Sequence, residues 1–99
     1  MASFDINVAA INWFDSSNGL HIRVYASDGN TITERCMDAG NNAWTTGDFK
    51  QPGTTASATV WVDSQGSHIR VYAVNEGVTT EWCADPGNGG WTQGSYAPA

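Results

Sequence analysis

Two stretches of this chain are copies of each other, and this duplication constrains the fold more than any other feature of the sequence. His21 to Lys50 aligns with His68 to Ala97 at a constant offset of 47 residues, and half of the aligned positions are identical. Upstream, Trp13 to Ser16 aligns with Trp61 to Ser64 once one extra loop residue is allowed in the first copy. The whole chain is therefore a tandem repeat.

Each repeat, residues 1–52 and 53–99 of one structural domain, is predicted to contain four short β-strands. The sequence is rich in Gly, Thr, Ser, Val and Trp and poor in Leu and Lys, which favours turns and strands over helices. Turn signals such as Asn18-Gly19 and Asp28-Gly29 separate the strands. The predicted strands of the first repeat are Val8 to Phe14, Leu20 to Ser27, Asn30 to Met37 and Ala43 to Thr46. Four strands in a period near 47 residues predict an all-β chain of two four-stranded β-propeller blades.

Two blades cannot close a propeller, which needs roughly four to eight. Left alone, they would expose their inner faces and edge strands to water. Association of identical chains is the simplest solution, and it would give four, six or eight blades from two, three or four copies. The repeat itself does not choose among these assemblies.

The charge of the chain excludes several classes of partner. The formal net charge is −6, and there is no basic stripe that could neutralise the phosphates of nucleic acids or of anionic lipids. Residues 1–5 have neither a basic segment nor an apolar run, so we expect no signal peptide and no membrane insertion. We expect a soluble protein that is cytoplasmic or exported by a non-classical route.

Two of the four basic residues, Arg23 and Arg70, occupy equivalent positions in the two repeats. A hairpin centred on residues 28–29 would place Arg23 directly opposite Glu34, and the second repeat would pair Arg70 with Glu81 in the same way. A guanidinium beside a carboxylate offers several donors and acceptors that suit the adjacent hydroxyls of a sugar ring. The alternative is an ordinary cross-strand ion pair, worth ~0.2 to 1 kcal/mol.

The five tryptophans suggest an apolar platform for the same ligand. Trp44 and Trp91 follow Gly- and Asn-rich loops, which places them near the rim of a blade. An indole beside the Arg and Glu residues would pack against the C–H face of a sugar. The alternative is packing between blades, which we predict for Trp82, whereas Trp13 and Trp61 could take either role.

No motif in the sequence indicates catalysis or a metal ion. Cys36 and Cys83 are equivalent residues that a ring would hold apart, so we expect free, structural thiols rather than a disulfide. His21 and His68 lack the spacing of metal ligands and are predicted to be ordinary strand histidines, so no cofactor is expected. A glycosidase needs two carboxylates flanking one bond, and each repeat offers one in the proposed cluster, so we predict that the protein is not an enzyme.

The ordered string I-R-V-Y, T-E-[RW]-C, Asp and W-T-x-G, present in both repeats, resembles the Aleuria-type fucose-specific lectins. It is most similar to the short two-blade bacterial members of the Ralstonia and Burkholderia type, and the similarity covers nearly the whole chain. The resemblance implies a homotrimer forming a six-bladed propeller that binds fucosylated glycans through multivalent sites between blades. The alternative is a propeller that binds a peptide, with Arg and Glu as simple ion pairs.

The resemblance also implies two types of fucose site. The first, within one chain, would use Arg23, Glu34, the backbone N–H of Asp48, and Trp61 and Trp91 as walls. The second, between chains, would use Arg70, Glu81, the backbone N–H of Ser95, and Trp13 and Trp44 of the neighbouring copy. Met37 and Ala84 stand where the bacterial members carry an aromatic residue, which implies one thinner wall in each site.

Overall fold

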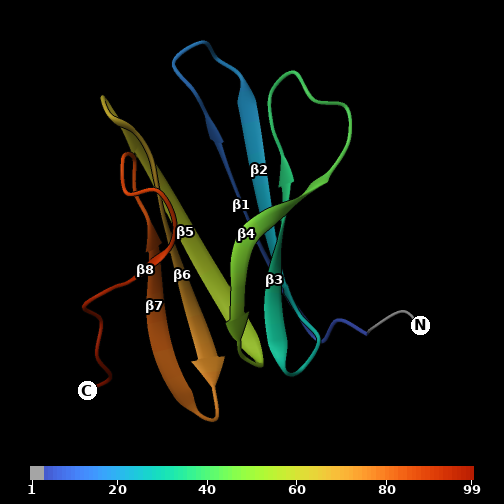
Figure 1. Cartoon of the computed structure of the whole chain (residues 1–99), viewed down its shortest axis with the longest axis vertical. Coiled ribbons are helices and arrows are strands. Elements are labelled where there is room, and N and C mark those ends of the chain that lie inside the picture. The colour runs from blue at the N-terminus through green and yellow to red at the C-terminus, as the bar shows by residue number, and fades with distance from the viewer. Residues whose placement is uncertain (1–3) are drawn as a thin grey trace.

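The computed structural model describes residues 4–99, which form two four-stranded antiparallel sheets lying side by side (Figure 1). Each sheet takes its strands in chain order, β1-β2-β3-β4 and β5-β6-β7-β8, so every connection within a sheet joins neighbouring antiparallel strands. The strands are β1 (Asn7–Phe14), β2 (Leu20–Ser27), β3 (Thr31–Met37), β4 (Thr45–Pro52), β5 (Thr55–Asp63), β6 (Gly66–Asn75), β7 (Val78–Ala84) and β8 (Thr92–Gln93). Residues 4–99 contain no helix that is long and apolar enough to cross a membrane.

The hydrophobic core lies where the two sheets meet. The first sheet contributes Ile11, Tyr25, Ile32 and Phe49, and the second contributes a group of small and branched side chains that includes Val71. Alternation along the strands produces this face, because successive side chains of a strand point to opposite sides of its sheet. The core therefore joins two sheets that each carry the same sequence motif.

Trp91, from the loop before β8, closes this core from the side of the second sheet. Its ring meets those of Phe49 and Tyr25 edge-on, with centroid separations of 4.8 and 6.0 Å. Trp82 is partly buried against the same core, which agrees with the packing role predicted for it. The two predicted structural thiols, Cys36 and Cys83, are buried and free.

The hairpin between β2 and β3 has a different register from the predicted one. Asp28 accepts hydrogen bonds at Oδ1 from the backbone N–H groups of Asn30 and Thr31, both at 2.9 Å, so it begins the turn instead of forming its centre. Gly29 follows with a φ of 101°, a left-handed conformation that favours glycine. The turn is thereby displaced by one residue along the chain, which moves every cross-strand partner by two.

The prediction that Arg23 lies directly opposite Glu34 was therefore wrong. Arg23 pairs with Cys36, and Glu34 pairs with Tyr25. The second sheet repeats this register, because Arg70 pairs with Cys83 and Tyr72 with Glu81. A shift of two residues leaves each side chain on its original face. Arg and Glu therefore remain on one face of the sheet as diagonal neighbours.

The fourth strand of the first sheet is longer and later than predicted, because it covers Thr45–Pro52 instead of residues 43–46. Its pairing with β3 is interrupted by a register shift between Thr33 and Arg35, opposite the segment around Gly47. A bulge of this kind adds unpaired residues and bends the strand. The polar sequence of this segment hides the strand, and only the buried Phe49 marks its inner face.

Candidate functional site

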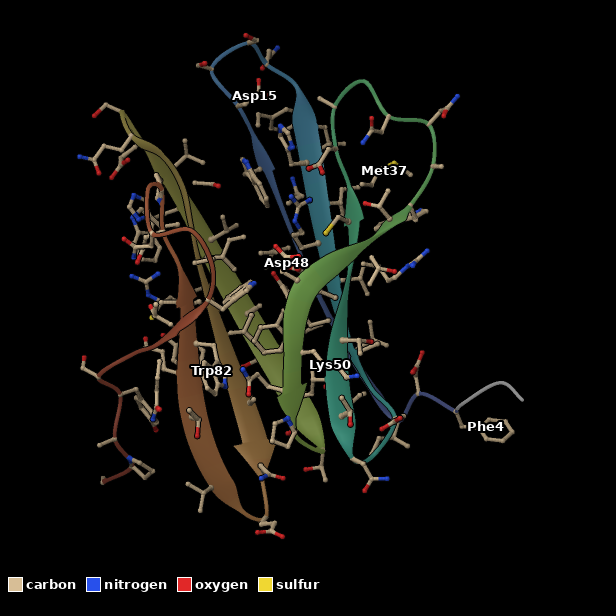
Figure 2. All side chains as sticks on the ribbon, viewed as in Figure 1. Phe4, Asp15, Met37, Asp48, Lys50 and Trp82 are labelled. Carbon is tan, nitrogen blue, oxygen red and sulfur yellow. The ribbon has the colours of Figure 1, made fainter. Side chains whose placement is uncertain are left out.

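A cleft of about 330 Å³ lies at the junction of the two sheets. One side consists of residues from the first sheet, among them Arg23 on β2, Glu34 on β3, and Gly47 and Asp48 on β4. The other side comes from the second sheet and consists of Ile69, Ala84, Asp85, Gly90 and Trp91. Figure 2 shows Asp48 between the two sheets. Four of the five residues predicted for the site within the chain, Arg23, Glu34, Asp48 and Trp91, thus line one cleft.

The Arg23 guanidinium is held along one edge. Its Nη1 donates to Oδ1 of Asp38 at 2.8 Å and to the backbone carbonyl of Ile22 at 3.0 Å, and its Cζ lies 5.0 Å from the ring centroid of Trp13. Both of these hydrogen bonds use Nη1, and Arg23 makes none through Nε or Nη2 within residues 4–99. The guanidinium therefore offers a free edge beside the cleft.

His21 connects this arginine to the β1–β2 loop. Nδ1 lies 2.7 Å from Oδ1 of Asp38 and Nε2 lies 2.8 Å from Oδ2 of Asp15, while the imidazole stacks on Trp13 at 5.2 Å with 10° between the planes. Both ring nitrogens face carboxylate oxygens, and only the imidazolium can donate from both. As the sequence indicated, His21 is a strand histidine, on β2, and its partners place it in a charged network beside the site.

The charges of this network stabilise one another. Hydrogen bonds to Asp38, and then to Asp15, raise the pKa of His21 above its ordinary value. Burial opposes the ionisation of Asp38, but hydrogen bonds from His21 and Arg23 outweigh it and lower the pKa of that carboxyl. The network therefore combines two carboxylates, one imidazolium and one guanidinium, and has no net charge.

Glu34 is the buried acceptor of the cleft, with only 4% of its surface exposed. Its Oε2 accepts a hydrogen bond from the Tyr25 hydroxyl at 2.7 Å, and its Oε1 accepts one from the backbone N–H of Phe49 at 3.3 Å. Burial and the neighbouring Glu34 raise the pKa of Tyr25 far above its ordinary value, which keeps the hydroxyl a donor. The carboxylate also lies against Gly47, where a Cβ atom would overlap it. Glu34 is thus fixed from two sides.

The second sheet reproduces this arrangement almost atom for atom. Nη1 of Arg70 donates to Asp85 and to the carbonyl of Ile69, both at 2.9 Å, and its Cζ lies 4.8 Å from the ring centroid of Trp61. The hydrogen bond to Asp85 raises the pKa of Arg70. Since both repeats build the same constellation, it is a property of the motif and not of one local environment.

The other members of the second constellation also match their counterparts. His68 bridges Asp85 at 2.7 Å and Asp63 at 2.8 Å, and it stacks on Trp61 at 4.9 Å. The carboxylate of Glu81 accepts hydrogen bonds from the Tyr72 hydroxyl at 2.9 Å and the Tyr96 backbone N–H at 3.1 Å. The predicted Ser95 is the exposed residue directly before Tyr96.

One wall residue predicted for the site within the chain, Trp61, lies elsewhere, and Trp13 occupies the equivalent place in the first sheet. Trp61 does not line the Arg23 cleft, because its ring stacks on His68 and covers Arg70 of its own sheet. Trp13 likewise covers Arg23, and it borders a separate hollow of about 310 Å³ between the β1–β2 and β5–β6 loops. The two indoles support the arginines of their own blades.

Sequence reasoning missed the side chains that orient Arg and Glu. Asp38, with Asp85, and Tyr25, with Tyr72, recur at the offset of 47, as the histidines do. Their recurrence was visible in the sequence. The predicted register paired each Arg with a Glu, so no partner was assigned to the Asp and Tyr residues. The Tyr hydroxyl holds Glu and the Asp carboxylate holds Arg.

The fold and the cleft define a pair of propeller-type blades with a ligand-sized pocket at their junction. The chain belongs to the fungal fucose-specific lectin family, whose family model matches residues 2–98. A search among curated proteins found no match.

Several solved structures are similar to this chain, and two of them are lectins bound to a methyl-fucoside. A fucose lectin from Kordia zhangzhouensis in complex with methyl-fucoside is 40% identical, with a TM-score of 0.75 over 92% of this chain and 65% of that one. The N224Q mutant of Aleuria aurantia lectin in complex with alpha-methyl-L-fucoside is 31% identical, with a TM-score of 0.71 over 90% of this chain and 30% of that one. This chain therefore spans less than two thirds of either structure. The predicted family resemblance is confirmed.

Proposed function

We propose that this chain is a fucose-binding lectin without enzymatic activity, and that fucosylated glycans bind in the cleft between the sheets. The observation that carries this proposal is the convergence of Arg23 and Glu34, on two strands of the first repeat, and Trp91, in a loop of the second, on one cleft. Two structures similar to this chain were determined with a methyl-fucoside, which supports the choice of sugar.

The groups in the cleft suit the two faces of a fucose ring. The free edge of Arg23 can donate to ring hydroxyls, while the fixed Glu34 carboxylate accepts from a hydroxyl. Trp91 and Ile69 provide the apolar surface for the C–H face and the methyl group. Recognition of this kind needs no metal ion, cofactor or proton transfer.

We further propose that a second site forms between copies of the chain. The half-site of Arg70 and Glu81 repeats the first site, but the opposite wall of the first site comes from the following sheet. The residues equivalent to that wall, Ile22, Met37 and Trp44, lie on the first sheet. Trp44 is 42% exposed, and Figure 2 shows Met37 on the side of the first sheet away from the second.

Docking this wall onto the Arg70 half-site of another copy would rebuild the cleft, with Met37 where Ala84 stands. The contact is head-to-tail, and repeating it generates a ring when the rotation between copies closes. We propose that three copies close a ring of six blades, which presents six sites and gains avidity on multivalent glycans. The expected mass in solution is three times the 10.6 kDa of the chain.

Tryptophan fluorescence on addition of methyl α-L-fucoside tests the sugar specificity, with galactose and mannose as comparisons. The wild type should respond to the fucoside, and Arg23→Ala combined with Arg70→Ala should abolish the response while circular dichroism stays unchanged. Lys50→Ala removes an exposed cation of β4 and is the control, which should respond normally. Equal responses to all three sugars, or a response that survives in the double variant, would contradict the proposal.

Calorimetry separates the two kinds of site. A ring should bind two fucosides per chain, whereas an isolated chain should bind one. Trp44→Ala should reduce the number of tight sites from two to one per chain, since Trp44 belongs only to the wall between copies. A single site per chain in the wild type would refute the site between copies and leave the first site intact.

A further inference from the structure

The two arginines of the sites share an unusual support, which ends in backbone. Asp15 accepts at Oδ1 from the N–H groups of Ser17 and Gly19, at 2.9 and 2.8 Å, and its other oxygen binds His21. His21 binds Asp38, and Asp38 binds Arg23. The chain of contacts therefore runs from a fixed loop to the guanidinium through alternating charges.

Asp38 is the member of this network that touches the arginine. Within residues 4–99 its carboxylate binds only His21 and Arg23, and it accepts no backbone N–H. Unlike Asp15 or Asp28, it does not stabilise a turn with its side chain. The Asp38 carboxylate therefore holds the side chains of His21 and Arg23 and does not support the backbone of its own loop.

The same carboxylate determines which edge of the arginine is free. Asp38 and the Ile22 carbonyl both bind Nη1, and Trp13 covers one face of the guanidinium. An arginine that is ordered before binding loses less side-chain freedom when the ligand arrives. A preordered guanidinium therefore favours affinity without adding a contact.

We propose that Asp38 and Asp85 are positioning residues for sugar binding, each of which holds one edge of its arginine so that the other edge faces the ligand. This inference rests on the proposed function. In this role each Asp binds its own arginine and does not touch the sugar that this arginine binds. The duplicated geometry, with Nη1 to Oδ1 distances of 2.8 and 2.9 Å, supports the same role in both blades.

The test is Asp38→Asn, which keeps the shape of the side chain and removes its charge. A fucoside titration followed at the Asp48 amide by NMR reports the Arg23 cleft alone. We expect affinity there to fall about tenfold, the factor that corresponds to losing one preordered side chain. The matched control is Asp28→Asn, the same change at the far turn of the β2–β3 hairpin, which should leave the affinity unchanged.

A second readout separates positioning from a general loss of stability. In the ligand-free wild type, the Nη protons of Arg23 should give NMR signals of a guanidinium with hindered rotation, and Asp38→Asn should average them. Arg70 in the same sample should remain hindered. Unchanged affinity in Asp38→Asn, or weakened affinity with Arg23 still hindered, would overturn the inference.

Two further results keep the inference distinct from the proposed function. Asp15→Asn loosens the far anchor and leaves the Arg23–Asp38 pair in place, so it should weaken binding about threefold, even if Asp38→Asn does not fold. An unaltered affinity in Asp15→Asn would contradict the network. If the wild type ignores methyl α-L-fucoside, the proposed function fails, while the Arg23 signals still decide whether Asp38 fixes the guanidinium.

Discussion

Replacing Tyr25 with Phe tests how strongly the fold depends on the buried carboxylate of the cleft. Tyr25 is fully buried, and its hydroxyl donates at 2.7 Å to Glu34, which is 4% exposed. The substitution keeps the ring that packs on Phe49 and removes only the donor, which leaves one oxygen of a buried carboxylate without a partner. Hydrogen bonds to charged groups contribute about 1.5–3 kcal/mol, so we expect a loss of about 2 kcal/mol.

This loss is large enough to measure by urea denaturation at a fixed protein concentration. For a chain of this size, about 2 kcal/mol corresponds to a shift of roughly 1 M in the urea midpoint, without a change in the slope. Tyr96→Phe is the matched control, since Tyr96 is 49% exposed, and it should cost less than about 0.5 kcal/mol. Equal effects of the two substitutions would refute the role assigned to Tyr25.

Three further predictions follow from the site. Gly47→Ala should destabilise the fold by about 1–3 kcal/mol in the same denaturation assay, because its Cβ would overlap the fixed Glu34 carboxylate; an effect within error of the wild type would contradict the packing. The pKa values of His21 and His68 are raised, chiefly by Asp38 and Asp85 respectively, so their stabilisation is complete below about pH 6.5 and is lost as the pH rises through the folded pKa. Thermal melts should therefore show lower stability at pH 8 than at pH 6, and a variant with both histidines replaced by Gln should lose this difference. Ala84→Trp should strengthen fucoside binding by about 1 to 3 kcal/mol in calorimetry by restoring an aromatic wall, and weaker binding would show that the cleft needs this space.

The duplication carried most of the prediction, because a repeat that recurs at one offset must build the same local structure twice. It predicted two four-stranded sheets, whereas the grouping of Arg23, Glu34, Asp48 and Trp91 at one junction was implied by the family resemblance. Arg23, Glu34 and Trp91 stood out in the sequence because their types recur in order, whereas Asp48 aligns with Ser95 and does not. Their mutual distances could not be found from the sequence.

The errors have a common cause in turn geometry. The sequence Asp28-Gly29 fits a two-residue turn, but the Asp28 side chain binds the backbone beyond it and moves the centre of the turn by one residue. The resulting register separates Arg23 from Glu34 and gives each its own partner, Asp38 and Tyr25. A side-chain hydrogen bond of this kind is a local competition that composition does not reveal.

The bulge in β4 and the roles of the two histidines were equally hidden. Nothing in the polar segment from Thr45 marks the bulge, which lies where the Glu34 carboxylate packs against Gly47. His21 looked like an isolated histidine because Asp15 and Asp38 are distant from it in sequence. Contacts between loops required the structure.

A crystal structure of the protein with methyl α-L-fucoside would test the central claim most directly. We predict a sugar ring in the cleft between the sheets, with the free edge of Arg23 and the Glu34 carboxylate on its hydroxyls and Trp91 against its C–H face. A sugar bound in the separate hollow beside Trp13, or a cleft that stays empty at saturating fucoside, would contradict the account.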